Sequence, residues 1–198
     1  MTVFVTVDAG DFVTGFYPND IYGEDEIPGD AIRITRETYS MLLKGRATNK
    51  RMRVLPDGTP ELSGPSVDEL RNAAWDRIKA DRDRRKTGGF KVRSLWFHSD
   101  HDSRIQHIGL KDKARDLLAA GGAMTDNLII LGQPVKWKTM DGSFATITAQ
   151  LAFDIVAAAG DLDARLFAVA ETHRSAMEAA TDPTTYDFSV GWPETFGG

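Results

Sequence analysis

The sequence predicts an α+β fold, with a small N-terminal β-rich unit that has one helix and then a mainly helical unit with a short β-hairpin. In the first part of the chain, apolar residues alternate with a period of two, which is typical of strands. From Ser66 onward they recur every three or four residues, which is typical of helices. Ser63-Gly64-Pro65 separates the two patterns and indicates a linker. We therefore expect domains at residues 1–63 and 66–198.

The N-terminal unit is predicted to begin with a hairpin. Apolar residues alternate over 3–7, Asp8-Ala9-Gly10-Asp11 has turn chemistry, and residues 12–17 have the pattern of a second strand. The acidic, turn-rich stretch 18–28 predicts a loop. A short strand is expected at 31–34.

A single helix is predicted next. Thr35 is a good N-cap for a helix to about Lys44, and Gly45 is expected to close it. The helix residues predicted to face the core are Tyr39, Leu42 and Leu43. A strand at 51–55 and a tight turn at 56–59 follow.

The second unit opens with a long predicted helix. Ser66 and Glu69 have the spacing of a capping box, and Gly88-Gly89 is expected to end the helix after about Lys86. Its predicted apolar face consists of Val67, Leu70, Ala74, Trp75 and Ile78.

A strand at 92–97 and a second helix are expected to follow, with Asp100 or Asp102 as the helix cap. The helix is predicted to end at Gly121-Gly122, and its predicted apolar residues are Ile105, Ile108, Ala114, Leu117 and Leu118.

Short strands are predicted at 128–131, 135–137 and 144–147, with a hairpin turn at Asp141-Gly142 between the last two. Thr148 is expected to cap a final helix to about Ala180. The stripe along this helix consists of Leu151, Ile155, Leu162, Leu166, Val169, His173 and Met177. The pattern leaves open whether the stripe is a coiled-coil partner surface or packs within the chain. The tail 181–198 is predicted to be extended and held by its aromatic residues.

Composition excludes several classes of protein. The 198-residue chain has no cysteine, which excludes disulfides, thiolate metal sites and cysteine nucleophiles. Its formal net charge of -5 gives no reason to expect nucleic acid as a partner. No apolar run is long enough to span a membrane, and the N-terminus lacks a signal-peptide pattern. The expected location is therefore the cytoplasm of the cell that makes the protein.

A cluster of imidazoles and carboxylates is the one group with metal-ligand residue types. It comprises His98, Asp100, His101, Asp102 and His107. Its spacing matches no zinc signature, so we expect helix capping and surface histidines, with a metal-dependent enzyme as the alternative. The chain lacks a Gly-x-Ser-x-Gly elbow and a phosphate-loop spacing. We therefore expect no catalytic, metal or cofactor-binding residues and no cofactor.

Tryptophans raise another alternative, a peptide- or glycan-binding module that stacks ligands on Trp96, Trp137 and Trp192. We favour a core position for Trp137, because large aromatic side chains are usually mostly buried. Arg104 is expected to pair with Asp100 or with acidic residues of the preceding helix. The residues singled out as a structural or interaction motif are Phe97, Asp100, Arg104, Trp137 and Trp192.

The N-terminal third contains a series of motifs in a definite order. They are Gly15-Phe16-Tyr17, then Ile27 to Thr35, then Tyr39, Leu42-Leu43 and Gly45, and finally Asp57-Gly58-Thr59-Pro60. In these motifs the chain resembles caudoviral tail-fibre assembly proteins.

The chain from about Val67 resembles a domain of unknown function common in phage tail and tail-fibre proteins. The matching patches, in order, are Arg82-Asp83-Arg84-Arg85 with Gly88-Gly89, Trp96-Phe97-His98-Ser99-Asp100 with Ser103-Arg104, Trp137 with Asp141-Gly142 and Thr148-Ala149, and Trp192-Pro193. Where this family commonly has an Asp-Asn pair, this chain has Asp141-Gly142.

Together these resemblances imply a tail-associated protein with no reaction of its own. The implied function is tail-fibre assembly, as a chaperone, or a structural role in the tail or baseplate. The implied partner is a phage tail-fibre or baseplate protein, with no nucleic acid and no membrane, and with homo-oligomerisation left open. The implied location is the host cytoplasm during assembly, or the virion tail.

Overall fold

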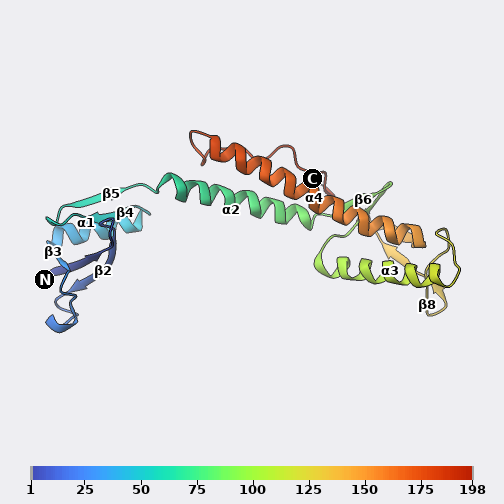
Figure 1. Cartoon of the computed structure of the whole chain (residues 1–198), viewed down its shortest axis with the longest axis horizontal. Helices are drawn as coiled ribbons and strands as arrows, with labels where there is room; N and C mark the ends of the chain where they lie inside the picture. Colours follow the sequence, from blue (N-terminus) through green and yellow to red (C-terminus); the bar gives the residue numbers. More distant parts are fainter. Residues whose placement is uncertain (1, 198) are drawn as a thin grey trace. The chain divides into compact units, whose positions relative to one another are not determined.

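A computed structural model of the chain (Figure 1) describes residues 2–197 and divides into two compact units, Met1–Leu70 and Arg71–Gly198. It combines α-helices with short antiparallel strands, and the N-terminal region is rich in strands, so the predicted α+β class is confirmed. Among the described residues, no helix has the length and apolar character needed to cross a membrane.

The first unit is built on an antiparallel sheet with the strand order β2-β1-β3. The predicted first hairpin is confirmed, and alternation places Val3 and Val5 in the core, fully buried. The bounds are β1 (Val3–Val7), β2 (Val13–Pro18), β3 (Ile32–Ile34) and, within the predicted loop, the 3-10 helix η1 (Glu24–Glu26).

Helix α1 (Arg36–Ala47) supplies the other layer of this core. The predicted cap is confirmed, because the Thr35 hydroxyl accepts a hydrogen bond from the Thr38 backbone N–H at 3.1 Å. Leu42 is fully buried, and the ring of Tyr39 packs edge-on against Phe16 at 5.1 Å. The prediction for Leu43 was wrong, since its side chain is exposed.

The sequence predicted that Gly45 ends α1, and this prediction was wrong. The helix continues to Ala47, and the left-handed residue beyond it is Asn49, with φ of 56°. Gly45 is buried, and a Cβ built there would lie 2.4 Å from Leu62 Cδ2. The glycine therefore lets the helix approach Leu62 closely.

Gly45→Ala is expected to destabilise the first unit by about 1–2 kcal/mol, because the added methyl group overpacks the contact with Leu62. Gly160→Ala is the matched control, since Gly160 is an exposed helical glycine, and a Cβ built on it would have no described atom within 4 Å. The control should gain up to about 1 kcal/mol through helix propensity. Hydrogen exchange of the backbone amides in each unit measures both effects. Equal responses would contradict the packing role of Gly45.

A second hairpin completes the first unit, with β4 (Arg51–Val54) and β5 (Pro60–Ser63) joined by a turn in which Gly58 has φ of 83°. The tight turn was predicted, but the sequence did not reveal β5. Arg53 ties this hairpin to the first one, because its guanidinium donates to the Gly10 carbonyl at 3.0 Å and to Asp11 at 3.1 Å.

The second unit contains most of α2 (Val67–Lys86). The predicted capping box is confirmed, because Glu69 accepts from the Ser66 backbone N–H at 2.6 Å and donates its own N–H to the Ser66 hydroxyl at 3.2 Å. Ala74 and Ile78 are buried as predicted, whereas Val67 is exposed, contrary to the prediction.

The predicted strand at 92–97 is instead a hairpin of β6 (Phe90–Val92) and β7 (Leu95–Phe97). The chain reverses at Arg93, which has φ of 57°. The sequence did not reveal this turn, because neither Arg93 nor Ser94, which lie between the strands, is a glycine.

Helix α3 (His101–Ala119) follows, and its predicted apolar face is confirmed only in part, since Ala114 is buried and Leu117 packs against the core but the two isoleucines do not. The buried residues are His107, Leu110 and Ala114, whereas Ile105 and Ile108 are exposed. A polar histidine takes the core position that the pattern had given to the isoleucines.

Two small hairpins lie between α3 and the last helix. The turn predicted at Asp141-Gly142 is confirmed, but the sequence did not reveal that Leu131-Gly132 also forms a two-residue turn. The bounds are β8 (Ile129–Ile130), β9 (Gln133–Pro134), β10 (Lys136–Lys138) and β11 (Phe144–Thr146).

Helix α4 (Ala149–Ala179) is a long helix that runs through the second unit (Figure 1). Thr148 caps it as predicted, accepting from the Leu151 N–H at 3.1 Å. Its apolar stripe is buried within the unit, where Ile155 belongs to one core cluster and Met177 to another. Intramolecular packing is therefore the correct interpretation of the stripe.

Candidate functional site

The segment between β7 and α3 is a rigid connection. The Phe97 side chain is fully buried, and the Ser99 hydroxyl accepts a hydrogen bond from the Gly89 N–H at 2.8 Å. Asp100 caps α3, accepting from the Ser103 hydroxyl and backbone N–H at 2.7 and 3.0 Å. These hydrogen bonds lower the pKa of the Asp100 carboxyl.

Arg104 joins this connection to the rest of the unit. Its guanidinium binds the two carboxylate oxygens of Asp163, on α4, at 2.8 and 3.0 Å. It also donates to the backbone carbonyls of Ser99 at 2.8 Å and of Lys86 at 3.2 Å. The predicted partners, Asp100 and the acidic residues of the preceding helix, were therefore wrong. The true partner lies 59 positions away in the sequence, where no local pattern reveals it.

The histidines of the candidate metal cluster are placed differently from one another. His98 is half-buried, His101 is exposed, and His107 is buried, while Asp100 is engaged as a helix cap. Within residues 2–197, no group of three His, Asp or Glu side chains is arranged to hold a metal ion. The structure therefore gives no support to the metal-enzyme alternative.

His107 and Trp137 form a buried aromatic pair. Their ring centroids are 4.4 Å apart, and Phe90 and Phe97 contact the imidazole edge-on. Burial lowers the pKa of His107 to about 4, so the ring is neutral at pH 7. Trp137 is half-buried and packs against the main core. Its Nε1 and both imidazole nitrogens are buried, with no hydrogen-bond partner among residues 2–197.

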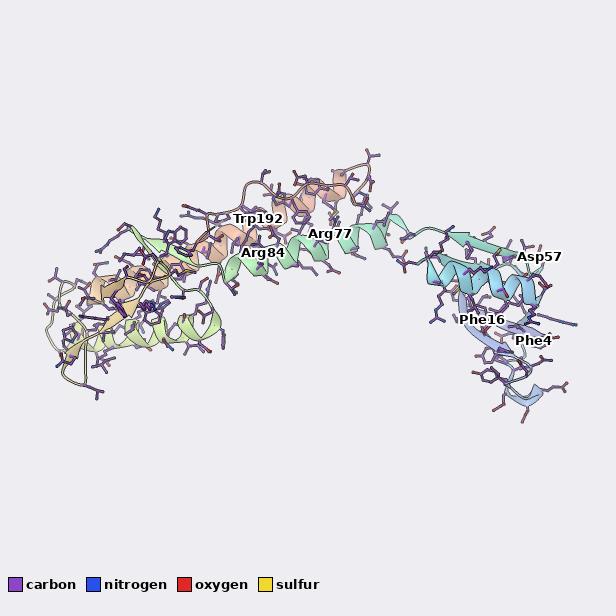
Figure 2. All side chains as sticks on the ribbon, turned by 180° about the vertical axis from the view of Figure 1, so that it is seen from behind. Phe4, Phe16, Asp57, Arg77, Arg84 and Trp192 are labelled. Atoms are coloured by element: carbon purple, nitrogen blue, oxygen red, sulfur yellow. The ribbon has the colours of Figure 1, made fainter. Side chains whose placement is uncertain are left out.

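Trp192 anchors the C-terminal tail, which runs alongside α2 (Figure 2). Its indole N–H donates to the Phe188 carbonyl at 2.6 Å, and its ring packs on His173 at 5.2 Å. The Nε2–H of His173 donates to the Val190 carbonyl at 2.9 Å, which leaves Nδ1 to accept from the Tyr186 hydroxyl at 2.9 Å. The prediction of an extended tail held by aromatic residues is confirmed.

A shallow groove of about 490 Å³ is lined by Trp96 and Trp192 together with Phe90, Lys91 and Arg165. Trp137 does not line it, so the structure does not bring the three candidate stacking residues into one surface. Trp192 is also occupied by its contacts with the tail and with α4.

The turn between β8 and β9 is an apolar surface feature that the sequence did not reveal. Leu131 is 98% exposed, and its neighbours Ile129 and Ile130 are also exposed. Leu131 and Gly132 have φ of 51° and 75°, the pattern of a type I′ turn, whose first position favours asparagine or glycine. A branched apolar side chain here is both strained and solvated. Gly132, directly after the apolar run from Leu128 to Leu131, was the available signal.

These contacts define an α+β protein whose buried polar groups tie helices together. Among the described residues, its most exposed large apolar side chain, Leu131, lies at a hairpin turn. The chain belongs to the family described as Domain of unknown function (DUF4376), whose model matches residues 69–190. No curated protein and no solved structure matched the chain.

Proposed function

We propose that this protein is a bacteriophage tail-fibre-associated docking protein that acts in fibre assembly, as a chaperone, or as a structural component of the tail or baseplate. The sequence resemblances of both parts of the chain to phage tail proteins support this proposal. The observation that carries it is the apolar turn of Ile129, Ile130 and Leu131, which the folded chain leaves exposed.

An exposed apolar turn is what a docking protein presents to a partner. Burying an apolar side chain contributes about 1.5–3 kcal/mol, so a partner that covers Leu131 gains affinity. The strained backbone of Leu131 costs stability in the free chain, and such cost is typical of functional positions. The polar side chains around Arg104, by contrast, are committed to internal contacts.

Co-expression with a phage tail-fibre protein, the proposed partner, tests the proposal. The chaperone form predicts that the fibre becomes soluble or trimeric only when this chain is present. The structural form predicts that the chain appears among the proteins of purified virions, as measured by mass spectrometry. A fibre that assembles equally well without this chain, together with virions that lack it, would overturn the proposal.

Leu131→Asn is expected to raise the stability of the chain and to weaken its docking to the fibre protein. Asparagine suits the left-handed position, so the free energy of unfolding should rise by about 0.5–1 kcal/mol. Capture of the fibre protein should nevertheless weaken, because the apolar contact is lost. Val190→Asn is the matched control, because Val190 is another exposed apolar residue of the same unit. If the two variants capture the fibre protein equally well, the turn is not the docking surface.

A further inference from the structure

The shallow groove of about 490 Å³ is built from three segments of the second unit. The β6–β7 hairpin, which lies beside α4 (Figure 1), contributes Lys91 and Trp96, and the C-terminal tail contributes Pro193. Helix α4 contributes residues from Ala158 to Val169, which span about 16 Å of the helix axis. The volume lies within the usual range of ligand sites. The groove can therefore hold an extended ligand.

Trp96 gives the groove an aromatic surface that the chain leaves partly free. The indole N–H of Trp192 is held by a backbone carbonyl, whereas that of Trp96 is accessible to solvent and makes no hydrogen bond within residues 2–197. The Trp96 ring is half-buried, with Phe196 edge-on at 5.9 Å and Lys91 Nζ at 5.7 Å from its centroid. Trp96 therefore offers a ligand both ring surface and a hydrogen-bond donor.

Four charged side chains also line the groove, and each is exposed. They are Lys91, Asp161, Arg165 and Glu194. Within the described part of the chain, none of them forms an ion pair or a side-chain hydrogen bond, although Asp161 and Arg165 have the spacing of a helical ion pair. By contrast, Arg93 and Asp154, from the same hairpin and the same helix, are paired at 3.1 Å. The groove thus offers a ligand two cations and two carboxylates that no internal contact occupies.

These charges favour a ligand that is neutral and has both hydrogen-bond donors and acceptors. Asp161 and Glu194 repel an anion, and Lys91 and Arg165 repel a cation. A wholly apolar ligand would cover the four charges without pairing them, which is costly. A carboxylate only accepts hydrogen bonds and an ammonium or guanidinium group only donates them, whereas a hydroxyl does both. A ligand rich in hydroxyls can therefore satisfy all four side chains.

We propose that this groove binds a neutral oligosaccharide, with the C–H face of one sugar ring packed on Trp96. Sugar hydroxyls donate to the carboxylates of Asp161 and Glu194, and hydroxyl oxygens accept from Lys91 and Arg165. The length of the groove along α4 suits a chain of sugars better than a single one. The site is separate from the proposed fibre contact, because Leu131 does not line the groove.

An extended peptide fits the groove less well than a sugar chain. Peptides commonly bind by adding a strand to a free sheet edge. Here the carbonyl of Trp96 already accepts from the Met140 N–H at 2.9 Å, and the carbonyl of Gly88, next to β6, accepts from the Phe196 N–H at 2.9 Å. The backbone groups that a peptide would use beside Trp96 are therefore occupied.

A glycan array tests the proposal. The full chain is clustered on fluorescent beads, so that weak binding is detected through avidity, and is applied to printed neutral oligosaccharides, acidic oligosaccharides, monosaccharides and peptides. The chain should bind neutral oligosaccharides, and should bind them more strongly than the corresponding monosaccharides. Binding to no glycan, to acidic glycans alone or to peptides alone would overturn the proposal.

Replacing Trp96 locates the bound sugar. In calorimetric titration with the strongest neutral ligand from the array, Trp96→Ala should raise the dissociation constant about tenfold or more, because the ring loses its apolar support. Trp75→Ala is the matched control. Trp75 is also half-buried, with Lys79 Nζ 5.8 Å from its ring centroid, but it does not line the groove. The control should leave the constant unchanged, and thermal melting confirms that both variants are folded.

Asp161→Asn tests the hydrogen bonds without disturbing the fold, because the Asp161 carboxylate takes part in no ion pair among the described residues. The dissociation constant should rise about fivefold, since a charge-assisted hydrogen bond becomes a neutral one. Asp116→Asn is the matched control, because Asp116 is an exposed helical aspartate of the same unit outside the groove. A sugar that binds Trp96→Ala and Asp161→Asn as tightly as wild type occupies another site, and the proposal then fails.

Discussion

Arg104→Ala is expected to lower the free energy of unfolding of the second unit by about 2–3 kcal/mol. The variant loses the bidentate bond to Asp163 and leaves the carbonyls of Ser99 and Lys86 without this donor. The estimate lies below that for a fully buried ion pair, because the Asp163 side chain is 37% exposed and partly screened by water.

Tryptophan fluorescence during denaturant unfolding measures this loss selectively, because all four tryptophans of the chain lie in the second unit. Arg93→Ala is the matched control. Arg93 also binds an aspartate of α4, Asp154, at 3.1 Å, but its side chain is 64% exposed. The control should change stability by no more than about 0.5 kcal/mol. If Arg104→Ala and the control unfold at the same denaturant concentration, the Arg104 contact with Asp163 does not stabilise the second unit.

Acid is expected to destabilise the second unit through His107. Burial lowers the pKa of this ring from 6.5 to about 4. Between these values the unfolded chain binds a proton that the folded chain does not bind, so the free energy of unfolding falls as the pH falls. The loss amounts to about 2 kcal/mol at pH 5 and about 3 kcal/mol at pH 4, relative to pH 7.

His107→Leu isolates this contribution, because leucine keeps an apolar group in the site but cannot bind a proton. The stability difference between the variant and the wild type should move in favour of the variant as the pH falls from 7 to 4. Phe90→Leu, which alters the packing against the same ring, should lower stability by a similar amount at both pH values. A difference between His107→Leu and wild type that is independent of pH would contradict a neutral buried His107.

The exposed apolar turn at Leu131 is proposed as the contact with a different protein. A strained and solvated leucine has no other reason in the folded chain.

Local chemistry allowed several elements to be predicted from the sequence. Thr35, Asp100 and Thr148 cap helices as predicted, because a side-chain oxygen next to free backbone N–H groups acts within one turn. The turns at Gly58 and Gly142 were also predicted, since few other residues adopt their positive φ easily. The α+β class followed from the change of apolar period near Ser63-Gly64-Pro65.

The tertiary structure decided which face of each helix is buried and which distant groups meet. Arg104 found Asp163 rather than Asp100, and His107 entered the core in place of Ile105 and Ile108. Gly45 serves packing against Leu62 rather than helix termination. These outcomes depend on contacts between segments far apart in the chain, which local preferences do not encode. The three helix caps and the turns at Gly58 and Gly142 are set by near neighbours, and so the sequence by itself determined them.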